Sequence, residues 1–135
     1  MGRWIIGYLA AGAAFVALDI GWLRLMTPGV YRPAIGHLLA EQFNSGAAVA
    51  FYVLYIAGLV AFGIKPGVDS RSLMAAALWG GAFGLAAYAT YDLTNMATLK
   101  DWPLKLTLID MAWGTAASAA ASVAGCAALS ALSKT

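Results

Sequence analysis

The stretch SLMAAALWGGAFGLAAYATYDLTN, residues 72–95, decides the fold class. Its first 20 residues, 72–91, carry no charge and are mostly apolar. A helix of about 20 such residues is long enough to span the hydrocarbon core of a bilayer. A helix is favoured because a spanning segment must satisfy its own backbone hydrogen bonds. The stretch therefore predicts a membrane-spanning helix over about 72–91, followed by a polar string that begins at Asp92.

Three further segments predict spanning helices, at about 4–26, 46–64 and 104–132. Of the 135 residues, 62% are hydrophobic and 10% are charged, whereas a soluble domain carries about 25% charged residues. The first apolar run continues to Met26, which is too long for a typical signal-peptide core, so we expect it to be retained. The predicted fold class is all-α, a four-transmembrane-helix bundle that forms one integral membrane domain over residues 1–135.

The joints between the later spans contain turn and capping residues. Pro66 and Gly67 are expected to end the second helix, and Ser70 to cap the third. Asp101 is expected to cap the fourth helix, with Pro103 in its first turn, where the missing N–H costs nothing.

The segment between the first two spans predicts a helix break and then a short interfacial helix. The break is expected at Pro28, Gly29 and Pro33. Apolar residues then recur near helical spacing, which predicts a helix lying in the membrane interface; they are Ile35, Leu38, Leu39 and Phe43. His37 and Glu41, one turn apart, are expected to pair.

Four spans place both termini on one side of the membrane. Basic residues are divided equally: Arg3, Lys65, Arg71 and Lys134 lie on the terminal side, and Arg24, Arg32, Lys100 and Lys105 on the other. The balance gives no positive-inside assignment, and it also suits a dual-topology dimer. We expect a multi-pass protein of the bacterial inner (cytoplasmic) membrane with cytoplasmic termini.

Three aspartates are predicted to lie in the leaflet away from the termini. Asp19 lies near the end of the first span, Asp92 at the end of the third and Asp110 near the start of the fourth. Two of them continue rows of small residues at four-residue spacing, which let membrane helices approach closely. One row is Ala76, Gly80, Gly84, Tyr88 and Asp92; the other is Asp110, Gly114, Ser118, Ser122, Cys126 and Ser130. Asp19 ends a weaker row of Gly7, Ala11 and Phe15. Asp92 and Asp110 are therefore expected to face one shared pocket.

An ionisable residue inside a membrane is by default a functional candidate. Asp92 and Asp110 could act as acid, base or hydrogen-bond acceptor, with Asp19 tuning them. The candidate ligand-binding residues are Tyr88, Tyr91, Thr94, Asn95, Trp22, Trp113, Arg24 and Lys105. Trp22 and Trp113 lie in two similar strings, LDIGW (18–22) and IDMAW (109–113). Arg24 and Lys105 are candidate counter-charges for the aspartates. The alternative is structural: Asp19 and Asp110 would be polar locks, and the residues around Asp92 would satisfy a helix end. Trp4, Trp79 and Trp102 are expected to be interface anchors or to fill the core.

Several site types are disfavoured by the residue counts. One histidine and one cysteine make a usual zinc site or a bis-histidine haem improbable. The net charge of +2 is too small and dispersed for nucleic acid. We therefore expect no cofactor, no metal and no nucleic-acid partner.

Several strings resemble a known protein family. They are AAVAFYVLYIAGLVAF (47–62), FGLAAYATYDLTNMATLKDWP (83–103) and LTLIDMAWGT (106–115). They closely resemble an uncharacterised family of small bacterial membrane proteins, the domain of unknown function numbered 2177. The resemblance runs from ALDIGWLRL (17–25) to IDMAWGT, and YATYDLTN (88–95) is its most specific marker. It implies an integral membrane protein with a polar site and supplies no mechanism.

Three function classes follow from these observations. The first is a site, open to one leaflet, that binds or modifies a lipid or small amphiphile. The second is a small proton-coupled transporter that acts as a dimer. The third is an accessory subunit of a larger membrane complex, without chemistry of its own. Expected partners are membrane lipids and a second copy or a larger complex.

Overall fold

The computed structural model describes residues 1–134, which are helical apart from short connections and contain no strand. Four long helices dominate: α1 (Gly2–Met26), α3 (Ser45–Leu59), α5 (Leu73–Thr98) and α6 (Leu104–Leu132). Shorter pieces extend the first two: η1 (Thr27–Tyr31), α2 (Arg32–Ile35), η2 (Gly36–Leu38), η3 (Val60–Ile64) and α4 (Lys65–Asp69). With these extensions, four helical segments are long and apolar enough to cross a membrane. The predicted all-α, four-helix fold class is confirmed.

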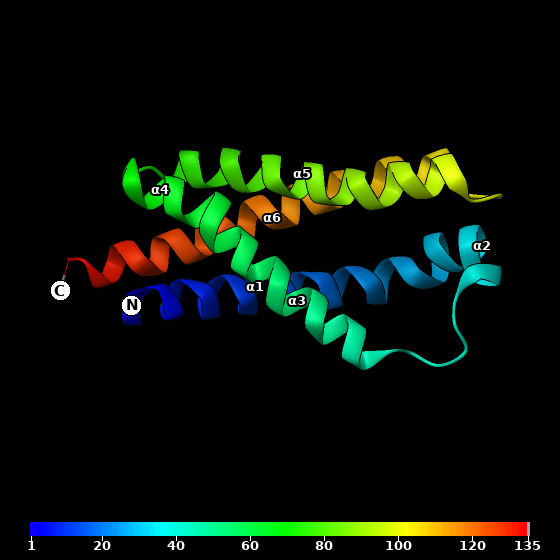
Figure 1. The fold of residues 1–135 in the computed structure, drawn as a ribbon, viewed down its shortest axis with the longest axis horizontal. Coiled ribbons are helices and arrows are strands. Elements are labelled where there is room, and N and C mark those ends of the chain that lie inside the picture. The colour runs from blue at the N-terminus through cyan, green and yellow to red at the C-terminus, as the bar shows by residue number, and fades with distance from the viewer. Residues whose placement is uncertain (135) are drawn as a thin grey trace.

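The four helices form an elongated bundle with both described chain ends at the same end (Figure 1). α5 and α6 run antiparallel along their length and make the most extensive contact, followed by α1 with α6. α3 crosses the bundle obliquely and begins in the half away from the termini (Figure 1). The C-terminal part of α1 and the loop between α5 and α6 lie at the end away from the termini.

Small residues bring α5 and α6 together. A Cβ atom on Gly84 would collide with the Gly114 carbonyl oxygen and with Ser118, and one on Gly114 would collide with the Tyr88 ring. A Cβ on Gly80 would likewise strike Ser122. The predicted rows of small residues are therefore the buried faces of the two helices.

Two prolines expected to stop helices lie instead within continuous helical segments. Pro33 and Pro66 each occupy the second position of a short α-helix that directly follows a π-helical turn. A proline ring clashes with the carbonyl four residues earlier in an α-helix. The wider π turn moves that carbonyl away, so the predicted breaks at Pro28, Gly29, Pro33, Pro66 and Gly67 are wrong.

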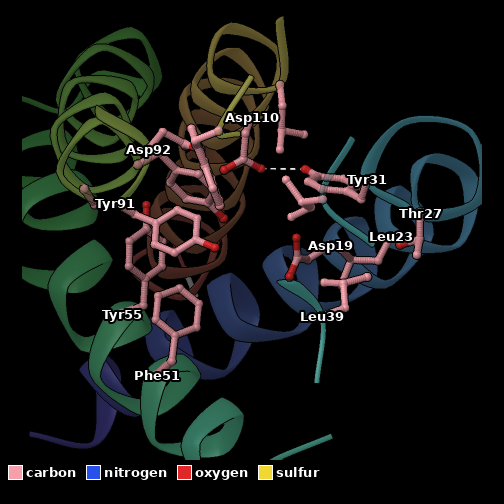
Figure 2. A pocket seen from close by; sticks show the side chains of 15 residues that line it. Asp19, Leu23, Thr27, Tyr31, Leu39, Phe51, Tyr55, Tyr91, Asp92 and Asp110 are labelled. Atoms are coloured by element: carbon pink, nitrogen blue, oxygen red, sulfur yellow. Dashed lines mark hydrogen bonds between the residues drawn. The ribbon is translucent and has the colours of Figure 1, made fainter. Parts of the chain in front are cut away.

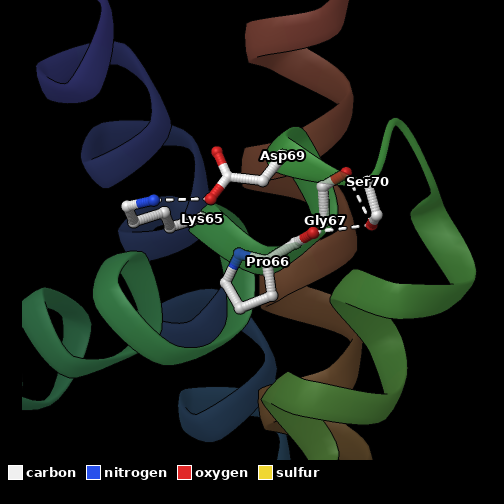
Figure 3. A network of polar contacts seen from close by, with 5 residues as sticks. All are labelled: Lys65, Pro66, Gly67, Asp69 and Ser70. Carbon is white, nitrogen blue, oxygen red and sulfur yellow. Dashed lines mark hydrogen bonds and ion pairs between the residues drawn. The ribbon is translucent and has the colours of Figure 1, made fainter.

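The predicted caps also differ from the observed ones. Because α4 extends to Asp69, Ser70 lies at its C-terminal end and donates to the Pro66 carbonyl oxygen at 2.6 Å (Figure 3). Ser72 caps α5 instead, accepting from the Ala75 backbone N–H at 3.1 Å. Asp101 adopts a left-handed backbone with φ of 61°, so it does not cap α6, which begins after Pro103 without a side-chain cap.

The third span is longer than predicted. α5 continues to Thr98, seven residues beyond the expected end at Tyr91. Two threonines on this extension, Thr94 and Thr98, and Thr90 just before it donate to carbonyl oxygens one turn back, so their hydroxyls are satisfied inside the helix. Asp92 therefore lies within a helix and not at its end.

The expected interfacial helix is not present as a separate element. Helical structure continues from α1 through α2 and η2 to Leu38, and residues 39–44 are irregular. The π turn η1 keeps this segment joined to α1.

We predict that Gly84→Ala destabilises the protein by about 1–3 kcal/mol, because the added methyl group overpacks the α5–α6 contact. Gly21→Ala is the matched control, since a Cβ at Gly21 meets nothing within 4 Å. Thermal unfolding of both variants in one detergent measures the difference. Equal unfolding midpoints would show that the close approach is not required.

Candidate functional site

A cavity of about 520 Å³ lies between the helices at the end away from the termini (Figure 2). We call it the carboxylate cavity. Its walls come from α1, η1, α2, α3, α5 and α6 and are mainly aromatic and aliphatic. The residues that line it are Asp19, Leu23, Thr27, Tyr31, Ile35, Leu39, Phe51, Tyr55, Ala87, Tyr88, Tyr91, Asp92, Trp102, Leu106 and Asp110. The structure thus brings the three predicted aspartates to one cavity.

Asp19 has a hydrogen-bond donor on each carboxyl oxygen. It is the fourth buried residue of α1 in the row Gly7, Ala11, Phe15 and Asp19. The Tyr52 hydroxyl donates to its Oδ2, and the Trp113 indole Nε1 donates to its Oδ1 at 3.3 Å. Asp19 therefore ties α3 and α6 to α1.

Asp110 accepts one hydrogen bond, from Tyr31 in the π turn that follows α1. The Tyr31 hydroxyl donates to its Oδ1 at 2.5 Å, and the Trp22 Nε1 in turn donates to the Tyr31 hydroxyl oxygen at 2.9 Å (Figure 2 shows the Tyr31–Asp110 bond). The Trp22 and Trp113 rings stack at 4.4 Å with 6° between their planes. Trp22 donates to the tyrosine that binds Asp110, and Trp113 donates directly to Asp19, so the stacked indoles support both carboxyl groups. Neither tryptophan lines the cavity.

Of the three aspartates in the cavity, Asp92 is the one that accepts no hydrogen bond from a described residue. It is fully buried, with 0% of its surface exposed, and neither carboxyl oxygen has a hydrogen-bond partner of good geometry among the described residues. It lies in the cavity wall on α5, beside the Asp110 carboxyl group on α6. A buried polar group without partners is costly, and the neighbouring Asp110 carboxyl group can share a hydrogen bond with Asp92 only when one of the two is protonated.

Aromatic side chains form the remaining walls. The Tyr55 hydroxyl lies 2.6 Å from the Ser118 hydroxyl, and the Tyr55 ring meets the Tyr88 ring edge-on at 6.2 Å. Tyr91 meets Trp102 edge-on at 5.7 Å. Trp102, expected to be an interface anchor or to fill the core, lines the cavity, and its indole donates to Thr107 at 3.0 Å.

Besides the two tryptophans, four further predicted ligand-binding residues lie outside the cavity lining. Thr94 donates to backbone carbonyls of its own helix, and Asn95 is half-buried one turn beyond Tyr91. Arg24 and Lys105 are exposed. The lining contains no basic side chain, so none of the expected counter-charges lies in the cavity; Asp110 accepts from a tyrosine, and Asp19 from a tyrosine and a tryptophan.

The predicted His37–Glu41 pair is also replaced. His37 Nε2 lies 3.8 Å from Asp101 Oδ2 in the α5–α6 loop, because the helix that would have aligned His37 with Glu41 ends at Leu38. Within residues 1–134, no group of three or more histidine, cysteine or acidic side chains is arranged to hold a metal ion.

The sequence-based prediction missed three tyrosines of the site: Tyr31, Tyr52 and Tyr55. Two of them lie three residues apart in AFYVLYIAG (50–58), and such a pair shares a helix face. Two hydroxyls on one face of an otherwise apolar span were the available signal. Nothing in the sequence shows that Tyr31 reaches α6, 79 residues away.

We predict opposite stability effects for two isosteric substitutions. Asp19→Asn leaves one of its two donors facing an amide N–H, which costs about 1–3 kcal/mol. Asp92→Asn removes an unpartnered carboxyl group, so the unfolding midpoint is unchanged or higher. Thermal unfolding of both variants in the same detergent measures this order. A loss at Asp92 equal to that at Asp19 would mean that Asp92 holds the fold together.

Comparison with known proteins gives one match. Residues 4–127 match the model of a family described as a predicted membrane protein, DUF2177. Neither the comparison with curated proteins nor that with solved structures gives a match.

Proposed function

The chain belongs to the DUF2177 family of predicted membrane proteins, and we propose that its carboxylate cavity binds a lipid or small amphiphile taken from one leaflet. The observation that carries this proposal is the unpartnered carboxyl group of Asp92 in the wall of an aromatic cavity. Sites for small molecules are typically apolar cavities of about 300–1,000 Å³ with a few polar groups that orient the ligand. The carboxylate cavity has this size and composition.

The exposed lining residues support lateral entry from the membrane. Leu23, Leu39, Phe51 and Tyr91 line the cavity and are each more than 40% exposed. They belong to α1, the loop before α3, α3 and α5, and α3 diverges from α5 at this end (Figure 1). In a membrane, an amphiphile could pass between these helices with its chain still in the hydrocarbon region.

The packing toward the termini argues against a transport path. Beyond Tyr88, the helices are in close contact: Gly63 and Gly80 both meet Ser122, and Gly125 meets Ile64. These contacts pack the helices closely between the carboxylate cavity and the termini. A proton-coupled transporter would need a path through this packed half.

The three aspartates take different roles in this proposal. Asp92 and Asp110 face the ligand, and either can act as hydrogen-bond acceptor or general acid–base group if the ligand is modified. Asp19, with both oxygens occupied, positions α1 and α3 around the cavity.

The proposal also places the cavity in the outer leaflet of a bacterial inner membrane, with cytoplasmic termini. At the terminal end, Arg3, Arg71 and Lys134 line one common cleft. A basic cleft suits the cytoplasmic side, where lysine and arginine are in excess.

We predict that Ala87→Phe blocks the site. Ala87 lines the cavity, so a phenyl ring there fills the space, whereas the neighbouring Ala86 is exposed and outside the lining. The probe is a photoactivatable long-chain alcohol in lipid nanodiscs, with crosslinks mapped by mass spectrometry to the peptide containing Phe51 and Tyr55. Labelling should fall at least about tenfold in Ala87→Phe, a loss of about 1.4 kcal/mol in binding, and stay unchanged in Ala86→Phe. Equal labelling of the two variants would refute the cavity as the binding site.

A further inference from the structure

The proposed amphiphile has a head group whose chemistry the cavity restricts. Resting on the proposed function, we propose that this head group is a primary ammonium, so that the ligand is a long-chain amine held between Asp92 and Asp110. The argument has three parts: the charge of the lining, the free acceptors and the aromatic walls.

The composition of the lining disfavours an anionic head group. The cavity has three carboxyl groups and no lysine, arginine or histidine in its walls. A phosphate or carboxylate ligand would have to approach these groups without a counter-charge in a low-dielectric site, where like charges repel strongly. A cationic head group would instead be attracted to these carboxyl groups.

The distribution of donors identifies where a cation would sit. Both oxygens of Asp19 are occupied, and Oδ1 of Asp110 is occupied by Tyr31. Both oxygens of Asp92 lack a donor although the residue is fully buried. A group with several N–H donors placed beside Asp92 and Asp110 would therefore satisfy acceptors that the chain leaves unsatisfied. An alcohol has one donor and no charge, and charge-assisted hydrogen bonds are about twice as strong as neutral ones.

The aromatic walls favour the same group. Tyr55, Tyr88 and Tyr91 line the same cavity as the carboxyl pair (Figure 2 shows Tyr55 and Tyr91). Aromatic ring faces attract cations, and more strongly in desolvated sites. The alkyl chain would lie along Leu23, Leu39 and Phe51, the exposed part of the lining.

The test is competition against the photoactivatable alcohol in the wild-type protein. Four competitors share a twelve-carbon chain: dodecylamine, dodecyltrimethylammonium, dodecanol and dodecyl phosphate. We expect dodecylamine to displace the probe at a concentration at least about tenfold lower than dodecanol. Dodecyltrimethylammonium should be weaker than dodecylamine, because it has charge but no N–H donor, and dodecyl phosphate should be weakest.

The variants assign the preference to the carboxyl pair. Asp92→Asn should abolish the advantage of dodecylamine over dodecanol while alcohol labelling of the cavity persists. Asp110→Asn should reduce the same advantage and provides a second variant if the first unfolds. Asp101→Asn is the control, since Asp101 is an exposed carboxylate at the same end of the molecule and outside the cavity; its preference should match the wild type.

The results separate the amine assignment from the binding proposal. If dodecanol or dodecyltrimethylammonium competes as well as dodecylamine in the wild type, the primary-ammonium assignment is overturned and the cavity still binds amphiphiles. If the probe labels the cavity in neither the wild type nor Ala86→Phe, the binding proposal itself fails.

Discussion

The close approach of α5 and α6 is the constraint on which the rest of the structure depends. Gly84 and Gly114 leave no room for a Cβ atom where these helices meet. Two turns beyond Gly84 on α5 lies Asp92, and one turn before Gly114 on α6 lies Asp110, so the same contact brings the two carboxyl groups together. The Tyr88 ring packs over Gly114 and also lines the cavity, which marks the level at which close packing ends and open space begins.

The three aspartates illustrate how differently one bundle can treat the same side chain. Asp19 is satisfied by a tyrosine and a tryptophan on other helices, Asp110 accepts from a tyrosine, and Asp92 has no donor. Their exposed fractions are 9%, 8% and 0%, so the least solvated group is also the least satisfied. The three carboxyl groups therefore differ more in the number of their hydrogen-bond donors than in their burial.

The spacing of small residues predicted the helix faces well, because close approach is a local requirement that the sequence must meet residue by residue. The weak row ending at Asp19 is buried at every position, and the rows through Gly84 and Gly114 form the α5–α6 contact. Helix ends were predicted poorly, since whether Pro66 stops a helix depends on the width of the preceding turn. The hydrogen bonds from Tyr31 to Asp110 and from Tyr52 to Asp19 were missed, because a hydrogen bond between distant helices depends on their rotation, which no local pattern records.

The two π turns have a geometric consequence for the whole chain. A π turn contains one residue more than the α turn it replaces, and each residue advances an α-helix by about 100°. The turn at Thr27–Tyr31 therefore sets the direction in which Tyr31 faces, and the turn at Val60–Ile64 does the same for Gly67, whose missing side chain admits Ala76 and Cys126. The exact number of residues in these two turns therefore helps to determine the structure, independently of their side chains. A helix of the same composition with one residue fewer would direct both positions away from their present neighbours.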